Sequence, residues 1–230
     1  MDLSVRDSAR LLNVSEKSIY RWIKEGKLPA YRVSDQYRFN RAELLEWATS
    51  QRINVAAEIF VEPHNGHHPL GLADALRAGG IHYRVGGSDK DEALRAVVDL
   101  MPLAEQVDRR FLLQVLLARE SLGSTAIGNG IALPHVRNPV VMHVSRPMVT
   151  LCFLEKPVEF GALDGQAVHT LFTMLSPTVR AHLHTLARLS HALQQPAFAQ
   201  MIRGQGNREQ ILAACEAIDS SVPGSAPDSS

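Results

Sequence analysis

The segment 119–137 concentrates residues that could handle a charged group. Its sequence is RESLGSTAIGNGIALPHVR. The glycines permit tight backbone turns, and Ser124 and Thr125 offer hydroxyls and N–H groups beside them, a composition suited to holding a phosphate. Because no Gly-Lys-Ser or Gly-Lys-Thr follows, the segment does not match a nucleotide-hydrolysing loop. The residues therefore predict an anion site without nucleotide hydrolysis.

The end of this segment places an imidazole where it could accept a phosphoryl group. Residues 131–133 are apolar and predict a short buried strand, and Pro134 restricts the backbone just before His135. Side chains at such strand ends commonly face a crevice. A neutral imidazole is nucleophilic near pH 7, and Arg119 could neutralise phosphoryl oxygens during in-line transfer. We interpret His135 as a phosphoryl acceptor.

A second candidate lies in the helix predicted over 178–193. His182 and His184 point about 200° apart on a helix, so they cannot both face one site. His182 lies beside the predicted apolar face, whereas His184 is expected to face water. On the helix pattern alone, His182 is a boundary histidine that packs and hydrogen-bonds.

The elements that must position these residues alternate between helical and strand-like patterns over 70–218. Apolar strands are predicted at 147–154 and 167–175. Helical periodicity marks five ranges, namely 70–78, 90–101, 108–118, 178–193 and 207–217. Ser88 with Asp91 is expected to cap the second of these helices. This mixed order predicts an α/β fold.

These motifs together resemble a known family. Residues 119–135 resemble the signature of the enzyme IIA domain in the fructose, mannitol and nitrogen-regulatory branch of the bacterial phosphotransferase system. The resemblance extends to DGQAV at 164–168 and HLHTL at 182–186. It implies a mixed sheet flanked by helices over 70–218.

The resemblance also implies a role for individual residues. His135 would take a phosphoryl group from the histidine phosphocarrier protein HPr or from its nitrogen-branch counterpart. Arg119 would steady that group, and His182 would hydrogen-bond it or the acceptor ring. Ser124 and Thr125 would support the pocket.

Residues 1–52 predict a separate helical head. Ser4 with Asp7 resembles a capping box that starts a first helix, and Ser15 caps a second that ends near Gly26. Lys17, Arg21 and Lys24 fall on the side of this second helix opposite its apolar stripe. Two helices joined by a short turn, with a basic outer face on the second, have helix-turn-helix geometry.

A short hairpin and a third helix complete the head. The hairpin is predicted from 31–33 and 37–39, and Asn40 with Glu43 caps a helix through Trp47. With these pieces the head resembles the excisionase and MerR-type winged helix-turn-helix family. The DNA contacts that this implies are Lys17, Ser18, Arg21, Lys24, Arg32 and Arg38.

The tip of the hairpin departs from that family. Ser34 and Asp35 stand where the family places a glycine and a cation. An anion at the tip would oppose a DNA phosphate. A dimerisation or protein-docking role for the head therefore stays open beside DNA binding.

Length and charge fit two modules. The 230 residues carry 24 Lys and Arg against 24 Asp and Glu, which argues against a bulk polycation that coats nucleic acid. Within this balance, residues 1–52 hold 10 basic against 7 acidic residues, a net of +3, and the rest hold 14 against 17, a net of −3. We expect a linker over 53–69 and a disordered tail over 219–230, because both are rich in Pro, Gly or Ser.

The remaining signals concern location and metals. The chain has no apolar run long enough for a membrane span and no signal peptide, and its two cysteines are far apart in apolar stretches. These features predict a cytoplasmic protein. His64, His67 and His68 have ligand-like spacing, but no cysteine accompanies them, so we expect neither a metal nor a cofactor.

The modules together favour a regulator. Phosphorylation of His135 would change what the head does, and a head this small implies a homodimer on paired DNA half-sites. The alternative is a sugar-transport IIA component that relays phosphate to a separate IIB protein, with the head as a docking module. A weaker third reading is an interaction scaffold whose His135 is no longer phosphorylated.

Overall fold

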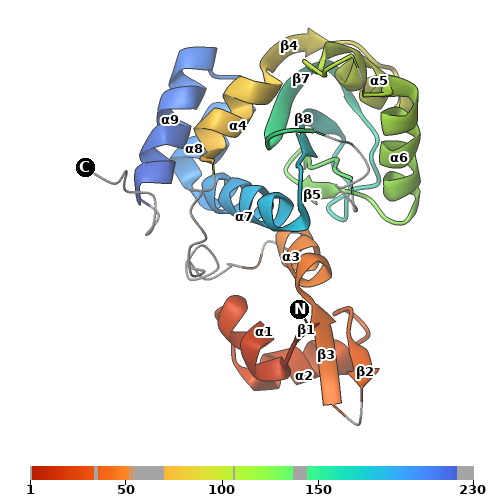
Figure 1. Cartoon of the computed structure of the whole chain (residues 1–230), viewed down its shortest axis with the longest axis vertical. Helices are drawn as coiled ribbons and strands as arrows, with labels where there is room; N and C mark the ends of the chain where they lie inside the picture. Colours follow the sequence, from red (N-terminus) through yellow and green to blue (C-terminus); the bar gives the residue numbers. More distant parts are fainter. Residues whose placement is uncertain are drawn as a thin grey trace.

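The computed structural model describes residues 2–33, 36–51, 53, 70–105, 107–136 and 144–221. Figure 1 shows a small head below a larger α/β body, with the third helix of the head between them. Within the described ranges, no helix combines the length and the apolar character that crossing a membrane requires. The predicted linker lies outside these ranges except for Ile53, and the three linker histidines lie outside them as well.

The head is a three-helix unit with a small antiparallel sheet. Its helices are α1 (Val5–Leu11), α2 (Glu16–Lys24) and α3 (Arg41–Ser50). Its strands are β1 (Asp2–Leu3), β2 (Tyr31–Val33) and β3 (Gln36–Asn40), in the order β1-β3-β2. The predicted capping box at Ser4 and Asp7 and the cap at Ser15 are confirmed. β1 was not predicted, because two residues show no periodicity.

The body is built on a five-stranded mixed sheet. Its strands are β4 (Ile81–Val85), β5 (Ala126–Gly128), β6 (Ile131–Ala132), β7 (Met148–Val158) and β8 (Val168–Leu175). They follow the order β4-β7-β8-β6-β5. The β4–β7 and β6–β8 pairs are parallel, and the other two pairs are antiparallel. The predicted α/β class, with a mixed sheet flanked by helices, is confirmed.

Helices cover both faces of this sheet. They are α4 (Leu72–Gly79), α5 (Lys90–Leu100), α6 (Arg109–Ser121), α7 (Val179–Gln194), α8 (Pro196–Arg203) and α9 (Arg208–Ser221). Successive residues of β7 point to opposite faces. Leu151 and Phe153 pack in the cluster formed with α4, α7, α8 and α9, and Cys152 and Leu154 pack with α5 and α6. Figure 1 shows these two groups of helices on opposite sides of the sheet.

The structure corrects two predicted boundaries. Asp89, and not Ser88, caps α5, because its carboxylate accepts the Glu92 amide while Ser88 donates to the Glu92 side chain. Residues 219–221, which were predicted to belong to a disordered tail, form the end of α9, and the rest of the predicted tail lies outside the described residues. Asp219 accepts the backbone amides at the start of α4 and pairs with Arg188 at 2.5 Å, which holds this part of the chain in the helix.

Candidate active site

A tight hairpin, formed by β5 and β6, precedes His135 in the chain. β5 and β6 are joined by Asn129 and Gly130, both at positive φ (54° and 70°), which is the geometry of a type I′ turn. The glycine-rich segment predicted to form a phosphate-holding loop is therefore a strand and a tight turn over residues 126–130, whereas the short buried strand predicted over 131–133 is present as β6. An Asn-Gly pair between two short apolar runs is itself a hairpin signal.

The backbone continues to pair with β8 beyond the end of β6. Ile131 is in register with Thr170, and four residues later His135 forms a bridge with Met174. The Met174 amide donates to the carbonyl of Pro134 at 2.9 Å. His135 therefore lies just beyond a buried strand, as predicted, and only 4% of it is exposed.

The hydrogen bond made by the His135 ring decides which nitrogen can react. Nδ1 lies 2.7 Å from the carbonyl oxygen of Leu133. A carbonyl only accepts hydrogen bonds, so Nδ1 holds the proton of the neutral ring. Nε2 then carries the lone pair and is the nucleophilic atom.

Helix α7 brings His182 against this ring. The His135 and His182 ring centroids are 5.1 Å apart with planes inclined at 36°. His182 is buried, and Thr178 accepts the Ala181 amide and so caps the turn that carries it. The histidine that the helix pattern alone assigned to the core boundary thus also lies beside the candidate acceptor.

His184 does not face water as predicted. Its Nε2 atom accepts a hydrogen bond from Nε of Arg188 at 3.2 Å, and the residue is half-buried. Burial first, and then the Arg188 charge, lower the pKa of His184 to about 4. A helix wheel describes one helix alone, so it could not show that Asp219 of α9 pairs with Arg188, the partner of His184.

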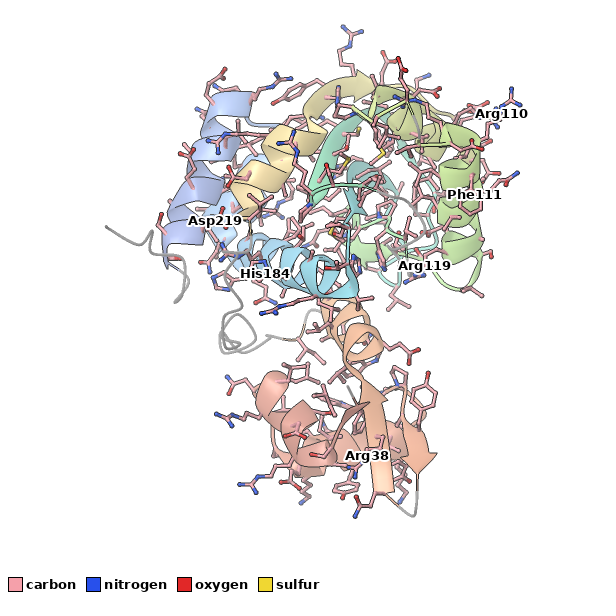
Figure 2. The ribbon with its side chains drawn as sticks, viewed as in Figure 1. Arg38, Arg110, Phe111, Arg119, His184 and Asp219 are labelled. Carbon is pink, nitrogen blue, oxygen red and sulfur yellow. The ribbon has the colours of Figure 1, made fainter. Side chains whose placement is uncertain are left out.

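Arg119 is placed at the end of α6, beside the cavity that holds His135. Figure 2 shows it on the side of the body that faces the head. One Nη atom donates to the carbonyl of Gly123 at 3.0 Å, which holds the guanidinium against the loop after α6. Arg119, Ser124, Thr125 and His135 line one cavity of about 430 Å³. The structure therefore brings the predicted cation and the predicted acceptor together.

The predicted loop hydroxyls donate their hydrogens to protein groups. Ser124 Oγ donates to the Phe160 carbonyl at 2.6 Å, and Thr125 Oγ1 donates to the Glu120 carboxylate at 2.6 Å. The amides of Thr125 and Ala126 also donate within the loop, to Glu120 and Ser124. These residues shape the wall of the cavity.

Glu120 is the residue that sequence reasoning missed. Its carboxylate is buried, accepts both the amide and the hydroxyl of Thr125, and lies 3.6 Å from Nζ of Lys90. A glutamate near a helix end usually faces solvent. Residue types alone therefore did not indicate that Glu120 is buried and binds the loop after α6.

The cavity has a second wall that the sequence did not predict. Pro29, Glu43, Trp47 and Thr49, all from the head, line it together with Arg119 and His135. The Tyr31 hydroxyl donates to Glu43 at 2.7 Å, and Trp47 packs on Trp22 with ring centroids 5.1 Å apart. The candidate site therefore lies between the two modules.

The candidate DNA contacts divide into exposed and engaged residues. Lys17, Arg21 and Lys24 are exposed on α2, the helix drawn lowest in Figure 1. Ser18 is engaged at the helix cap, since its amide donates to Ser15 Oγ. Arg38 is half-buried and donates to Gln36 at 2.8 Å. The Arg32 side chain and the hairpin tip lie outside what the structure describes.

Comparison with known families separates the two modules. The family described as "Phosphoenolpyruvate-dependent sugar phosphotransferase system, EIIA 2" matches residues 75–218. The family described as "Helix-turn-helix domain" matches residues 3–52. Their matches coincide with the body and the head of the structure.

Individual relatives are similar to the body. The "Nitrogen regulatory protein" of Escherichia coli (strain K12) is 30% identical over 149 residues, which cover 64% of this chain and 90% of the relative. The protein of that name from Pseudomonas aeruginosa is 32% identical over 143 residues, 61% of this chain and 91% of the relative. The crystal structure of nitrogen regulatory protein IIA-Ntr from Neisseria meningitidis covers 64% of this chain and 96% of its own, at 25% identity and a TM-score of 0.52.

Proposed function

The chain belongs to the EIIA type 2 family of the phosphoenolpyruvate-dependent sugar phosphotransferase system, and on that premise we propose that Nε2 of His135 accepts a phosphoryl group from HPr or its nitrogen-branch counterpart. The observation that carries this proposal is the hydrogen bond from Nδ1 to the Leu133 carbonyl, which leaves the Nε2 lone pair as the nucleophile. No cofactor is needed, because the donor brings the phosphoryl group already activated.

The proposed step conserves atoms and charge within one displacement. The Nε2 lone pair attacks phosphorus while the nitrogen–phosphorus bond of the donor histidine breaks, and that electron pair stays on the donor ring. Nδ1 keeps its proton and donates it in a hydrogen bond to the Leu133 carbonyl oxygen. Arg119 balances charge on the equatorial oxygens, and His182 hydrogen-bonds the phosphoryl group or the acceptor ring.

The phosphorylated chain acts in this proposal as a regulator with a DNA-binding head. The exposed basic residues of α2 and the net charge of +3 over residues 1–52 support DNA binding. The matches to nitrogen regulatory proteins support a regulatory role for the body. A single small head makes few base contacts, so specific binding implies a homodimer on paired half-sites.

The family description also favours a second candidate, a transport IIA component that relays phosphate to a separate IIB protein. The two functions predict different lifetimes for the phosphohistidine. A relay loses its phosphate rapidly when a cognate IIB protein and its sugar are added. A regulator keeps the phosphate and has a binding partner that is sensitive to it.

The decisive experiment is intact mass spectrometry after incubation with phosphoenolpyruvate, enzyme I and HPr. We expect the wild type to gain one acid-labile phosphate, about 80 Da, and His135→Ala to gain none. His184→Gln is the matched control, because it removes a half-buried histidine of α7 outside the cavity. A wild type that gains no phosphate, with these donors and with the nitrogen-branch donors, contradicts the proposal.

A further inference from the structure

Helix α3 of the head is buried on two sides. Leu44 and Ala48 are buried in the core of the head itself. Leu45, one residue away and 1% exposed, packs in the cluster that α7 forms on the body. Beside it the buried hydroxyls of Thr49 and Ser190 are 2.8 Å apart. The helix therefore docks on the body with a defined face.

This docked face borders the candidate acceptor. Glu43 and Trp47 of α3 line the cavity that also holds His135 and Arg119. In Figures 1 and 2, α3 stands directly below the end of the body that carries Arg119. One cavity is thus lined by residues of both the body and the head.

We propose that the face of the body around His135 is a shared docking surface, for which the head of this chain and the protein phosphodonor compete. This inference rests on the proposed function. A phosphoryl group moves between two histidines only when its phosphorus comes within about 3–3.5 Å of the attacking nitrogen. His135 is only 4% exposed, so a donor protein must reach it through the cavity, part of whose wall is formed by α3. The donor therefore displaces α3.

Electrostatic repulsion also means that phosphorylation of His135 should affect docking of the head. A phosphoryl group adds about −1.5 to −2 charges near neutral pH. On Nε2 it would lie in the cavity that the Glu43 carboxylate also lines. Like charges in a partly desolvated cavity repel, so phosphorylation weakens docking of the head. By linkage, docking disfavours phosphorylation to the same extent.

Docking leaves the basic face of the head open. Lys17, Arg21 and Lys24 are exposed while α3 is docked. Release of the head therefore changes its orientation and reach, and not the accessibility of α2. In a dimer, this would change the distance between two heads that bind paired half-sites.

A reversible covalent lock tests the competition. In the double variant Thr49→Cys and Ser190→Cys, the two sulfurs replace hydroxyl oxygens that are 2.8 Å apart, so oxidation should join α3 to α7. The native Cys152 and Cys215 are fully buried, and burial raises the pKa of each thiol to about 12, so they stay out of the reaction. The reduced double variant is its own control, and the two single variants control for each substitution.

The rate of phosphate transfer from HPr is then measured by intact mass. We expect the oxidised variant to be phosphorylated at least tenfold more slowly than the reduced one, with the rate restored by dithiothreitol. In the reverse direction, phosphorylating the reduced variant first should slow formation of the crosslink.

The outcomes separate this inference from the proposed function. Equal rates for the oxidised and reduced forms would overturn the competition and leave phosphorylation of His135 standing. Absence of phosphate on the reduced protein would overturn both. A second variant, Leu45→Asp, removes the apolar contact of α3 with the body and should be phosphorylated faster than wild type; an unchanged rate in a folded Leu45→Asp protein also contradicts the competition.

Discussion

At the scale of single residues, three histidines show how surroundings decide chemistry. The ring of His135 is oriented by the backbone carbonyl of Leu133, which leaves Nε2 as the proposed phosphoryl acceptor. His182 lies against it and supplies a second ring at the same site. His184, two positions along α7, accepts a hydrogen bond from Arg188 and is held neutral by burial. Identical side chains therefore differ in role: His135 is the proposed acceptor, His182 is its neighbour and His184 has a structural role.

The lowered pKa of His184 predicts a dependence of stability on pH. In the folded protein the pKa is about 4, against an ordinary value of 6.5. Between these values the unfolded chain binds a proton that the folded chain does not, so the free energy of unfolding falls as the pH drops through this window. His184→Gln should lose less stability between pH 7 and pH 5 than wild type, as measured by urea unfolding at both pH values.

Two other histidines limit how large this difference becomes. Burial also lowers the pKa of His82 and His169, and both remain in the variant. We therefore expect a smaller loss of stability in His184→Gln, and not a flat profile. An identical loss in variant and wild type would show that His184 titrates normally in the folded state.

At the scale of elements, the wall of the site depends on how α6 is tied to β5. Glu120 in the last turn of α6 accepts both the amide and the hydroxyl of Thr125, just before β5 begins. The type I′ turn then reverses the chain into β6 and towards His135. The position of His135 therefore depends on the buried carboxylate of Glu120 and on the two-residue turn between β5 and β6.

The contact between Thr125 and Glu120 gives a stability prediction. Thr125→Val keeps the shape of the side chain but leaves the buried carboxylate without the hydroxyl, which should cost about 1–3 kcal/mol. Thr125→Ser keeps the hydroxyl and should lose only about 0.8 kcal/mol for the missing methyl group. Urea unfolding of both variants measures this order, and a Val variant at least as stable as the Ser variant would refute the anchoring role of Glu120.

At the scale of the whole molecule, the charges are divided between the two modules. The head carries a net +3 and the remainder a net −3, and α2, which carries exposed cations, lies on the far side of the head from the body in Figure 1. A basic head on a mildly acidic body favours contact with nucleic acid through the head alone. With this arrangement, the proposed phosphorylation of the body would not cover the basic face of α2.

This arrangement predicts the effect of salt on DNA binding. Arg21→Ala should weaken binding to duplexes of any sequence and make the slope of log K against log salt shallower by about 0.9, the value for one phosphate contact. Lys27→Ala is the matched control, because Lys27 follows α2 and pairs with Glu25 at 2.8 Å. Fluorescence anisotropy over a salt series measures both. Equal slopes for the two variants would indicate that α2 does not face the phosphates.

The sequence by itself determined the local features of this protein. The capping residues at Ser4 and Ser15, the apolar strands around 147–154 and 167–175, and the position of His135 after Pro134 follow from periodicity and residue type, because these are set by neighbours along the chain. The elements β1, β4, β5 and α8 were missed; the three strands have at most five residues each, and so few residues carry too little pattern.

Only the tertiary structure decided what covers each surface. Periodicity shows that a helix has an apolar face, but not which other element packs on it. It therefore could not show that Glu120 anchors the loop, that Asp219 pairs with Arg188, or that α3 lines the cavity at His135. Each of these contacts joins groups whose pairing depends on how the chain folds back on itself, and the candidate active site is formed by such contacts.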